Sequence, residues 1–188
     1  MGRVHTLPLE PMTAESFAPF GEVLEARERP SDRRTLFPAN LRVDGAPTLH
    51  VIWQPAAGLR FTKLERHFGV TQTFFQLEGS PAVVAAAPPT DIHDPAALPD
   101  PASVRGFIID PAKGFAFKRG TWHSLDRYLA RPPGGVFVIL NVNPNPTQIV
   151  DYANGLSVRY ADLWTERETG RATLPGAWGV EFEVPATF

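Results

Sequence analysis

The sequence predicts an all-β protein, folded as a barrel or a sandwich of short strands. Twenty prolines and 15 glycines are spread along its 188 residues, which disfavours long helices and favours many turns. Between these turns stand short runs rich in β-branched and aromatic residues. Hydrophobic residues make up 43% of the chain, enough for one sizeable core, so we expect a single domain over residues 1–188.

The expected strands follow one another with turn-forming residues between them. They cover residues 21–25, 48–53, 61–67, 71–77, 82–86, 104–109, 114–117 and 135–142. Short strands separated by regular turns are typical of all-β barrels and sandwiches.

Two further regions complete the predicted organisation. A short N-terminal helix is expected over residues 14–18, because Thr13 can cap it and Pro19 ends it. Residues 147–188 are expected to form a C-terminal extension packed on the same domain, since they are too few for a second core. Within this extension, residues 158–168 have a pattern compatible with a helix.

The bulk composition argues against several classes of protein. A net charge of -2 gives no electrostatic reason to bind nucleic acid or an anionic membrane. No apolar run approaches the ~20 residues of a membrane span, and the first residues lack the apolar core of a signal peptide. The chain has 0 cysteines, which excludes disulfides and thiolate chemistry. We therefore expect a cytoplasmic protein without nucleic-acid or membrane partners.

Two separate stretches carry groups that can move protons or bind a metal ion. Side chains alternate along a strand, so Lys63, Glu65 and His67 share one face. Gln72 follows shortly afterwards, and a later glycine turn leads to His123. Two imidazoles, a carboxylate and an amide oxygen suit a divalent ion such as nickel, manganese or zinc. The same groups can also act as acid and base without a metal, and the sequence leaves both chemistries open.

The spacing of these stretches resembles the two motifs of cupin barrels. The first cupin motif is His-x-His-x(3,4)-Glu, and residues 65–72 keep its spacing as Glu-x-His-x4-Gln. The second motif, Pro-x-Gly-x-x-His, is matched by residues 118–123, with Lys in place of Pro. The resemblance implies a cupin-type double-stranded β-helix, or jelly-roll barrel, with both motifs on facing strands.

A wider set of residues resembles the ureidoglycolate lyase family. The matching text is Leu64-Glu65-Arg66-His67, Thr71-Gln72, the strand over residues 104–108 and Trp122-His123-x-Leu125, together with residues 7–9 and 17–24. The resemblance implies a homodimeric enzyme that cleaves ureidoglycolate into glyoxylate and urea during allantoin and purine breakdown. It also implies a divalent metal, which is associated with some members of the family.

The resemblance further implies roles for individual residues. The proton transfers fall to His123 and His67, and Glu65 orients them or shares the role of base. A fixed cation, Lys118 or Arg119, would hold the substrate carboxylate. The remaining expected substrate-binding residues are Gln72, Lys63 and Trp122. If a metal is bound, its ligands are expected to be Glu65, His67, Gln72 and His123.

The chain departs from the family pattern in two places. Family members carry an Asn-Gly segment leading to Arg and Asp-Leu before the second strand, but residues 36–49 lack it. A similar string stands instead at residues 154–163, and Asn141-Val142 replaces a family Asp-Arg pair. Two other functions therefore stay open: a diverged cupin enzyme acting on another small 2-hydroxy or 2-oxo acid, and a non-catalytic cupin that binds a small carboxylate.

Overall fold

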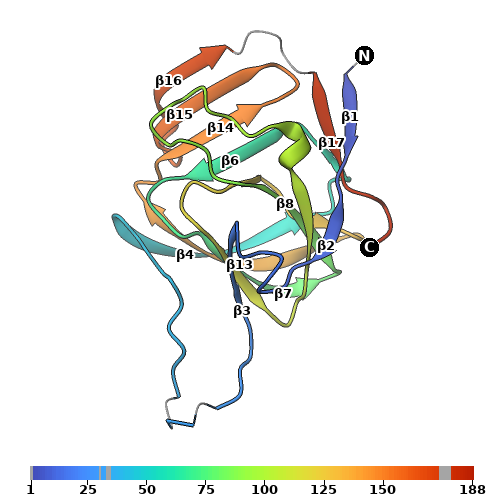
Figure 1. Cartoon of the computed structure of the whole chain (residues 1–188), viewed down its shortest axis with the longest axis vertical. Coiled ribbons are helices and arrows are strands. Elements are labelled where there is room, and N and C mark those ends of the chain that lie inside the picture. The colour runs from blue at the N-terminus through green and yellow to red at the C-terminus, as the bar shows by residue number, and fades with distance from the viewer. Residues whose placement is uncertain (1, 30, 33–34, 174–178) are drawn as a thin grey trace.

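The computed structural model describes all residues except 1, 30, 33–34 and 174–178, and in it the chain is almost entirely β-structure (Figure 1). One turn of 3-10 helix, η1 (Pro101–Ser103), interrupts the strands. The strands are β1 (Arg3–Thr6), β2 (Leu9–Pro11), β3 (Gly21–Leu24), β4 (Ala46–Pro55), β5 (Arg60–Phe61), β6 (Lys63–His67), β7 (Thr73–Gly79), β8 (Ala82–Ala87), β9 (Arg105–Ile109), β10 (Gly114–Phe117), β11 (Trp122–Ser124), β12 (Tyr128–Leu129), β13 (Gly134–Asn143), β14 (Thr147–Asp151), β15 (Leu156–Asp162), β16 (Arg167–Thr173) and β17 (Val180–Glu183).

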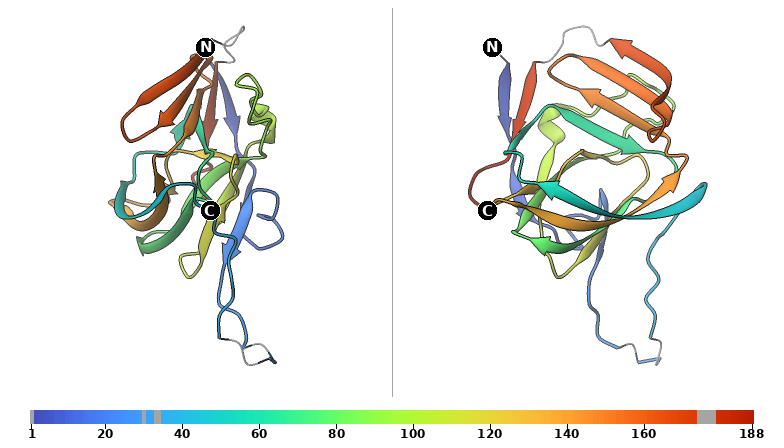
Figure 2. Two further views of the ribbon diagram at one scale, coloured as in Figure 1. Left: turned by 90° about the vertical axis from the view of Figure 1, so that its left-hand side faces the viewer. Right: turned by 180° about the vertical axis from the view of Figure 1, so that it is seen from behind.

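Two large sheets enclose the main core. One has the strand order β3-β10-β7-β13-β4, and the other runs β16-β15-β14-β6-β11-β8-β9-β2, with β12 paired to β8. Apolar side chains from both sheets, including Phe74, Phe107 and Phe137, are buried together between them. Figure 2 shows the two sheets curving around this space. The expected all-β, cupin-type fold is confirmed, and it accounts for the many turns and short strands of the sequence.

A second core lies on the opposite face of the larger sheet. Strand β8 is buried along its whole length, because Val84 packs into the main core while Val83 and Ala85 pack into the second one. Trp122 and Phe182 belong to this second core, which the sheet β1-β17-β5 helps to cover. Neighbouring residues of the larger sheet therefore face different cores, as the alternation of side chains in a strand requires.

Both expected helices are absent from the described residues. Residues 14–20 form successive turns, in which Phe17 donates to the carbonyl of Thr13 at 3.0 Å and Gly21 to that of Phe17 at 2.9 Å. Pro19 lacks the amide hydrogen that a continuous helix would need, so these bonds do not propagate. Residues 158–168 lie in β15 and β16 and the turn between them, because pairing with β14 overrides their helical pattern.

The residues from 147 onward contribute strands to the sheets. Strand β14 pairs antiparallel with β6 and places Thr147 opposite His67. Strands β15 and β16 extend the same sheet, while β17 lies between β1 and β5. The family-like string at residues 154–163 thus lies mainly in β15, which is separated from β6 by β14. No helix in the described part of the chain is long and apolar enough to cross a bilayer.

Candidate active site

Strands β6 and β11 bring the two predicted stretches together. They pair antiparallel, and His123 lies directly opposite Glu65. Because side chains alternate, Glu65 and His67 face the main core with His123, while Leu64 and Trp122 face the second core. The three candidate groups therefore meet on one inner face of the barrel.

The three side chains form a tight buried cluster. An oxygen of Glu65 lies 3.5 Å from Nε2 of His67 and 3.9 Å from Nδ1 of His123. The two imidazole centroids are 5.2 Å apart. His67 and His123 expose only 3% and 1% of their side chains, and Glu65 exposes 11%. A carboxylate thus sits between two imidazoles with little access for water.

The surroundings of His123 define which of its nitrogens is free to act. Nδ1 donates to the carbonyl of Ser124 at 3.0 Å, which leaves Nε2 with the lone pair. That Nε2 is buried and has no hydrogen-bond partner among the described residues. Burial lowers the pKa of His123 to about 4, against the opposing attraction of Glu65. At neutral pH the residue therefore presents a neutral imidazole with an available lone pair, and the Phe117 ring stacks on it at 4.4 Å.

His67 is held in a defined orientation by two neighbours. Its Nδ1 lies 2.8 Å from the hydroxyl of Thr147, which itself donates to the carbonyl of Asn145 at 3.1 Å. Since that hydroxyl hydrogen is used, Thr147 accepts the Nδ1 hydrogen of His67. Nε2 then carries the lone pair and accepts from the amide of Gln72 at 3.0 Å. The predicted group of Glu65, His67, Gln72 and His123 is therefore assembled in one place.

The charge on Glu65 is set by competing effects. Burial on its own would raise the pKa of the carboxyl, but the attraction of His67, His123 and Arg127 holds the pKa below its usual value. The carboxyl is thus an anion at neutral pH. It can stabilise a positive charge that develops on either imidazole.

The same cluster could hold a metal ion. Ligand atoms of Glu65, His67 and His123 lie within 4.8 Å of one another, and ligands of one ion at about 2.1 Å lie about 3 to 4 Å apart. Nε2 of His123 and Oε1 of Gln72 are both buried without a hydrogen-bond partner among the described residues. A cation between them would satisfy both atoms, so the donor set fits a divalent metal.

Two other predicted site residues lie away from the cluster. Lys63 is exposed at the start of β6, and its ammonium lies 3.9 Å from Asp151. Trp122 is fully buried in the second core, where its indole donates to Thr90 at 3.0 Å and its ring stacks with the guanidinium of Arg66 at 4.4 Å. Lys63 therefore lies at the exposed start of β6, and Trp122 lies on the face of β11 opposite to the cluster.

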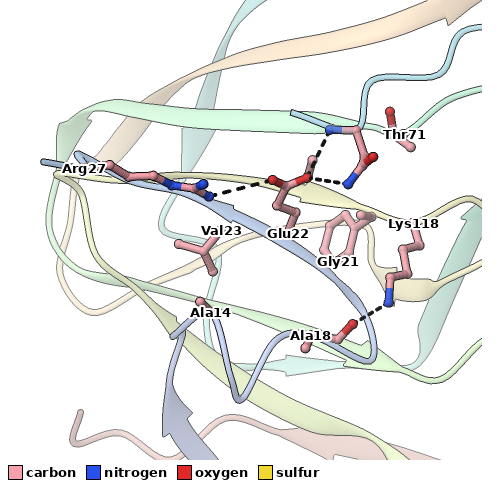
Figure 3. Close-up of a pocket in the computed structure, with 11 residues that line it drawn as sticks. Ala14, Ala18, Gly21, Glu22, Val23, Arg27, Thr71 and Lys118 are labelled. Carbon is pink, nitrogen blue, oxygen red and sulfur yellow. Dashed lines mark hydrogen bonds and ion pairs between the residues drawn. The ribbon is translucent and has the colours of Figure 1, made fainter. Parts of the chain in front are cut away.

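The two predicted carboxylate-binding cations also have other partners. Lys118 donates to the carbonyl of Ala18 and lines a surface pocket of about 220 Å³ (Figure 3). Arg119 makes an ion pair with Asp44 at 2.6 Å and donates to the carbonyl of Gly69. The pocket beside Lys118 shares the Phe117 side chain with the surroundings of His123, but the cluster itself does not line it.

Three residues near the cluster are absent from the sequence-based prediction. Thr147 reaches His67 from β14, Phe117 stacks on His123 from β10, and Arg127 lies buried close to Glu65. The aromatic alternation of residues 115–117 gave a signal that Phe117 faces inward. No local pattern marks Thr147 or Arg127, because only the pairing of distant strands and the turn after β11 bring them inward.

A jelly-roll barrel with a buried Glu-His-His cluster on its inner face defines a cupin-type protein. The sequence model of the ureidoglycolate lyase family matches residues 4–154, and the chain belongs to this family. The chain is 33% identical over 132 residues to a ureidoglycolate lyase of Pseudomonas paraeruginosa, covering 64% of this chain and 75% of that protein.

Further relatives bear the same name. A ureidoglycolate lyase of Burkholderia mallei is 32% identical over 130 residues, covering 63% of this chain and 72% of the relative. One from Azotobacter vinelandii is 31% identical over 129 residues, covering 62% and 74% respectively. The family assigns the chain to the lyases and implies a small-molecule substrate.

Proposed function

We propose that this protein cleaves ureidoglycolate into glyoxylate and urea, as a step of allantoin and purine catabolism. The observation that carries the proposal is the convergence of Glu65, His67 and His123 on the inner face of a barrel that belongs to this family. Acid-base cleavage of a carbinolamide needs a base and an acid within reach of one carbon atom. A neutral imidazole, a second imidazole and a carboxylate supply them.

The substrate, HO–CH(NH–CO–NH₂)–COO⁻, breaks at its C–N bond. We assign to Nε2 of His123 the removal of the hydroxyl proton, because no described residue forms a hydrogen bond with its lone pair. The oxygen electrons then form the C=O bond of glyoxylate, and the C–N bonding electrons leave with the urea nitrogen. The proton taken up by His123 is delivered to that nitrogen, with the Nε2 lone pair of His67 relaying it, so both imidazoles end neutral and atoms and charge balance.

Glu65 and Gln72 support these transfers. The Glu65 carboxylate lies close to both rings and stabilises the imidazolium that forms on each in turn. Oε1 of Gln72 has no hydrogen-bond partner in the described part of the chain and can accept a hydrogen bond from the ureido group. Lys118, Arg119, Lys63 and Trp122 are engaged outside the cluster, so the proposal places none of them on the reacting atoms.

As the alternative to the metal-free route, we propose that a divalent ion, with nickel, manganese and zinc as candidates, binds to Glu65, His67, Gln72 and His123; the lone pair of His123 would then bind the ion and would not take the hydroxyl proton. When bound, it would polarise the hydroxyl and carboxylate oxygens of the substrate. His67 and His123 would then ligate the ion through nitrogen, and Thr147 would fix the orientation of His67 from behind, as second-layer hydrogen bonds do in metal sites.

The purified protein should release glyoxylate and urea from ureidoglycolate, well above a protein-free blank. The test is a coupled assay of both products, run on protein treated with a chelator and on protein resupplied with nickel, manganese or zinc. Activity that appears only after resupply would establish the metal requirement. If neither preparation releases glyoxylate, the lyase proposal is wrong, and the diverged cupin enzyme and the non-catalytic carboxylate-binding cupin are the alternatives to test next.

We also propose a cytoplasmic homodimer. Its two copies would meet through the outer face of the sheet β3-β10-β7-β13-β4. In the strand register, Val51 of β4 lies opposite Val138 of β13, which lies opposite Phe75 of β7. Trp53 and Leu77 extend this apolar face and are each 61% exposed. Contiguous apolar faces of this kind mark interaction sites.

Light scattering should give the mass of two chains for the wild type and of one chain for Trp53→Glu. A wild-type mass of one chain contradicts this arrangement.

A further inference from the structure

Arg127 is a buried cation that forms no direct ion pair among the described residues, although the charges of Glu65 and Asp126 attract it. It follows β11 and exposes 6% of its surface. One Nη donates to the amide oxygen of Gln54 at 2.9 Å, and the guanidinium lies over the Phe74 ring at 4.6 Å. Its Nε is buried and makes no hydrogen bond, and it forms no ion pair among the described residues. A buried N–H donor left without a hydrogen bond disfavours folding, so the free Nε of Arg127 is better explained by a ligand than by stability alone.

A second buried arginine shows what a purely structural arrangement looks like here. Arg66 lies on the other face of the same sheet, and its Nε donates to Gln148 at 3.1 Å. Its two Nη atoms donate to the carbonyls of Thr90 and Asp91 at 3.0 and 3.2 Å. Every Arg66 nitrogen therefore has a partner. Arg127 differs from Arg66 because its Nε–H still has a hydrogen bond to give, and a bound ligand could accept it.

Arg127 belongs to the same interior as the catalytic cluster. Phe74, beneath its guanidinium, lies edge-on to Phe117 at 6.2 Å, and Phe117 stacks on His123 at 4.4 Å. The charges of Arg127 and Glu65 also attract each other. A small molecule that reached Nε2 of His123 would thus lie in the same barrel interior as an incompletely bonded guanidinium.

We propose that Arg127 binds the carboxylate of the substrate, so that the site selects small 2-hydroxy acids over their neutral amides. The inference rests on the proposed function for the identity of the substrate. A guanidinium presents a planar fork of donors that matches a carboxylate, and a charge-assisted bond of this kind is stronger than a neutral one. The carboxylate would complete the hydrogen bonding of Nε and give Arg127 the direct ion pair that Glu65 and Asp126 do not form with it. Arg127 would then do what the sequence assigned to Lys118 or Arg119.

The test compares two ligands that differ in charge but hardly in shape, glycolate and glycolamide. Calorimetric titration of the wild-type protein should show glycolate binding about 10- to 100-fold more tightly, the range expected for charge-assisted bonds. Arg127→Gln should lose this preference by weakening glycolate alone. Arg127→Lys, which keeps the charge but not the fork, should give an intermediate preference.

Arg119→Gln is the rival variant. If the preference for glycolate disappears there and persists in Arg127→Gln, the carboxylate binds at Arg119 and the proposal is overturned. An equal loss of both ligands in Arg127→Gln would show that the residue only supports Glu65, which also overturns it. Because binding is measured without turnover, failure of the lyase reaction leaves this test intact.

A measurement on the wild type covers the case in which Arg127→Gln does not fold. The Nε–H group of a buried arginine gives a resolved signal in ¹⁵N spectra, and Arg127→Lys assigns it by removing it. Glycolate should shift this signal and glycolamide should not. A signal that neither ligand moves, at concentrations that saturate the site, contradicts carboxylate binding at Arg127.

Discussion

His123→Ala should lower the turnover of ureidoglycolate at least about 100-fold, the lower range for loss of a general base. Among the described residues, Nε2 of His123 has no hydrogen-bond partner, whereas the Nε2 lone pair of His67 is engaged by Gln72. His123→Gln, which keeps a polar side chain of similar size, should be equally inactive. Steady-state kinetics together with circular dichroism measure both variants and separate lost chemistry from lost fold.

His93→Ala is the matched control, since that histidine is exposed and lies outside the barrel interior. It should retain wild-type kinetics.

The pH dependence of turnover gives a second test of His123. Because its pKa is lowered to about 4, the neutral, proton-accepting form persists well below the ordinary value of about 6.5. kcat/KM should therefore fall only as pH approaches 4. Turnover retained in a folded His123→Ala variant would remove this residue from the mechanism.

Much of the fold could be predicted from local patterns. The runs over residues 82–86 and 114–117 form β8 and β10 nearly as expected, because their apolar composition and flanking turns match strand geometry. The helical pattern of residues 158–168 misled the prediction. Pairing of β15 with β14 on one side and β16 on the other supplied backbone hydrogen bonds to the strand residues of this segment, and tertiary context outweighs a weak propensity.

The site residues, too, were only partly predictable from the local sequence. Strand alternation places Glu65 and His67 on one face, and motif spacing brings His123 to them. Neither argument says which cation faces the substrate. Lys118 and Arg119 stand next to the motif, yet their side chains leave the cluster, whereas Arg127 enters the interior from the following turn. Proximity in sequence is a poor guide once a strand has ended.

Trp122→Ala should cost about 3–5 kcal/mol of unfolding free energy, the range for truncating a buried large aromatic side chain. The ring is fully buried in the second core, and its loss also removes the stacking partner of Arg66 and the hydrogen bond to Thr90. Urea unfolding followed by circular dichroism measures the change. Trp164→Ala, at a tryptophan that is 49% exposed, is the control and should cost far less.

The effect of Trp122 on catalysis should be the reverse of that of His123, although the two are adjacent in sequence. Because side chains alternate along β11, the imidazole faces the inside of the barrel and the indole faces the second core. The folded fraction of Trp122→Ala should therefore keep the KM for ureidoglycolate within a few-fold of wild type. A KM raised tenfold or more at unchanged stability would restore Trp122 to the substrate pocket. If KM stays within a few-fold instead, Trp122 reports on folding and His123 on chemistry, because their side chains lie on opposite faces of the sheet that separates the two cores.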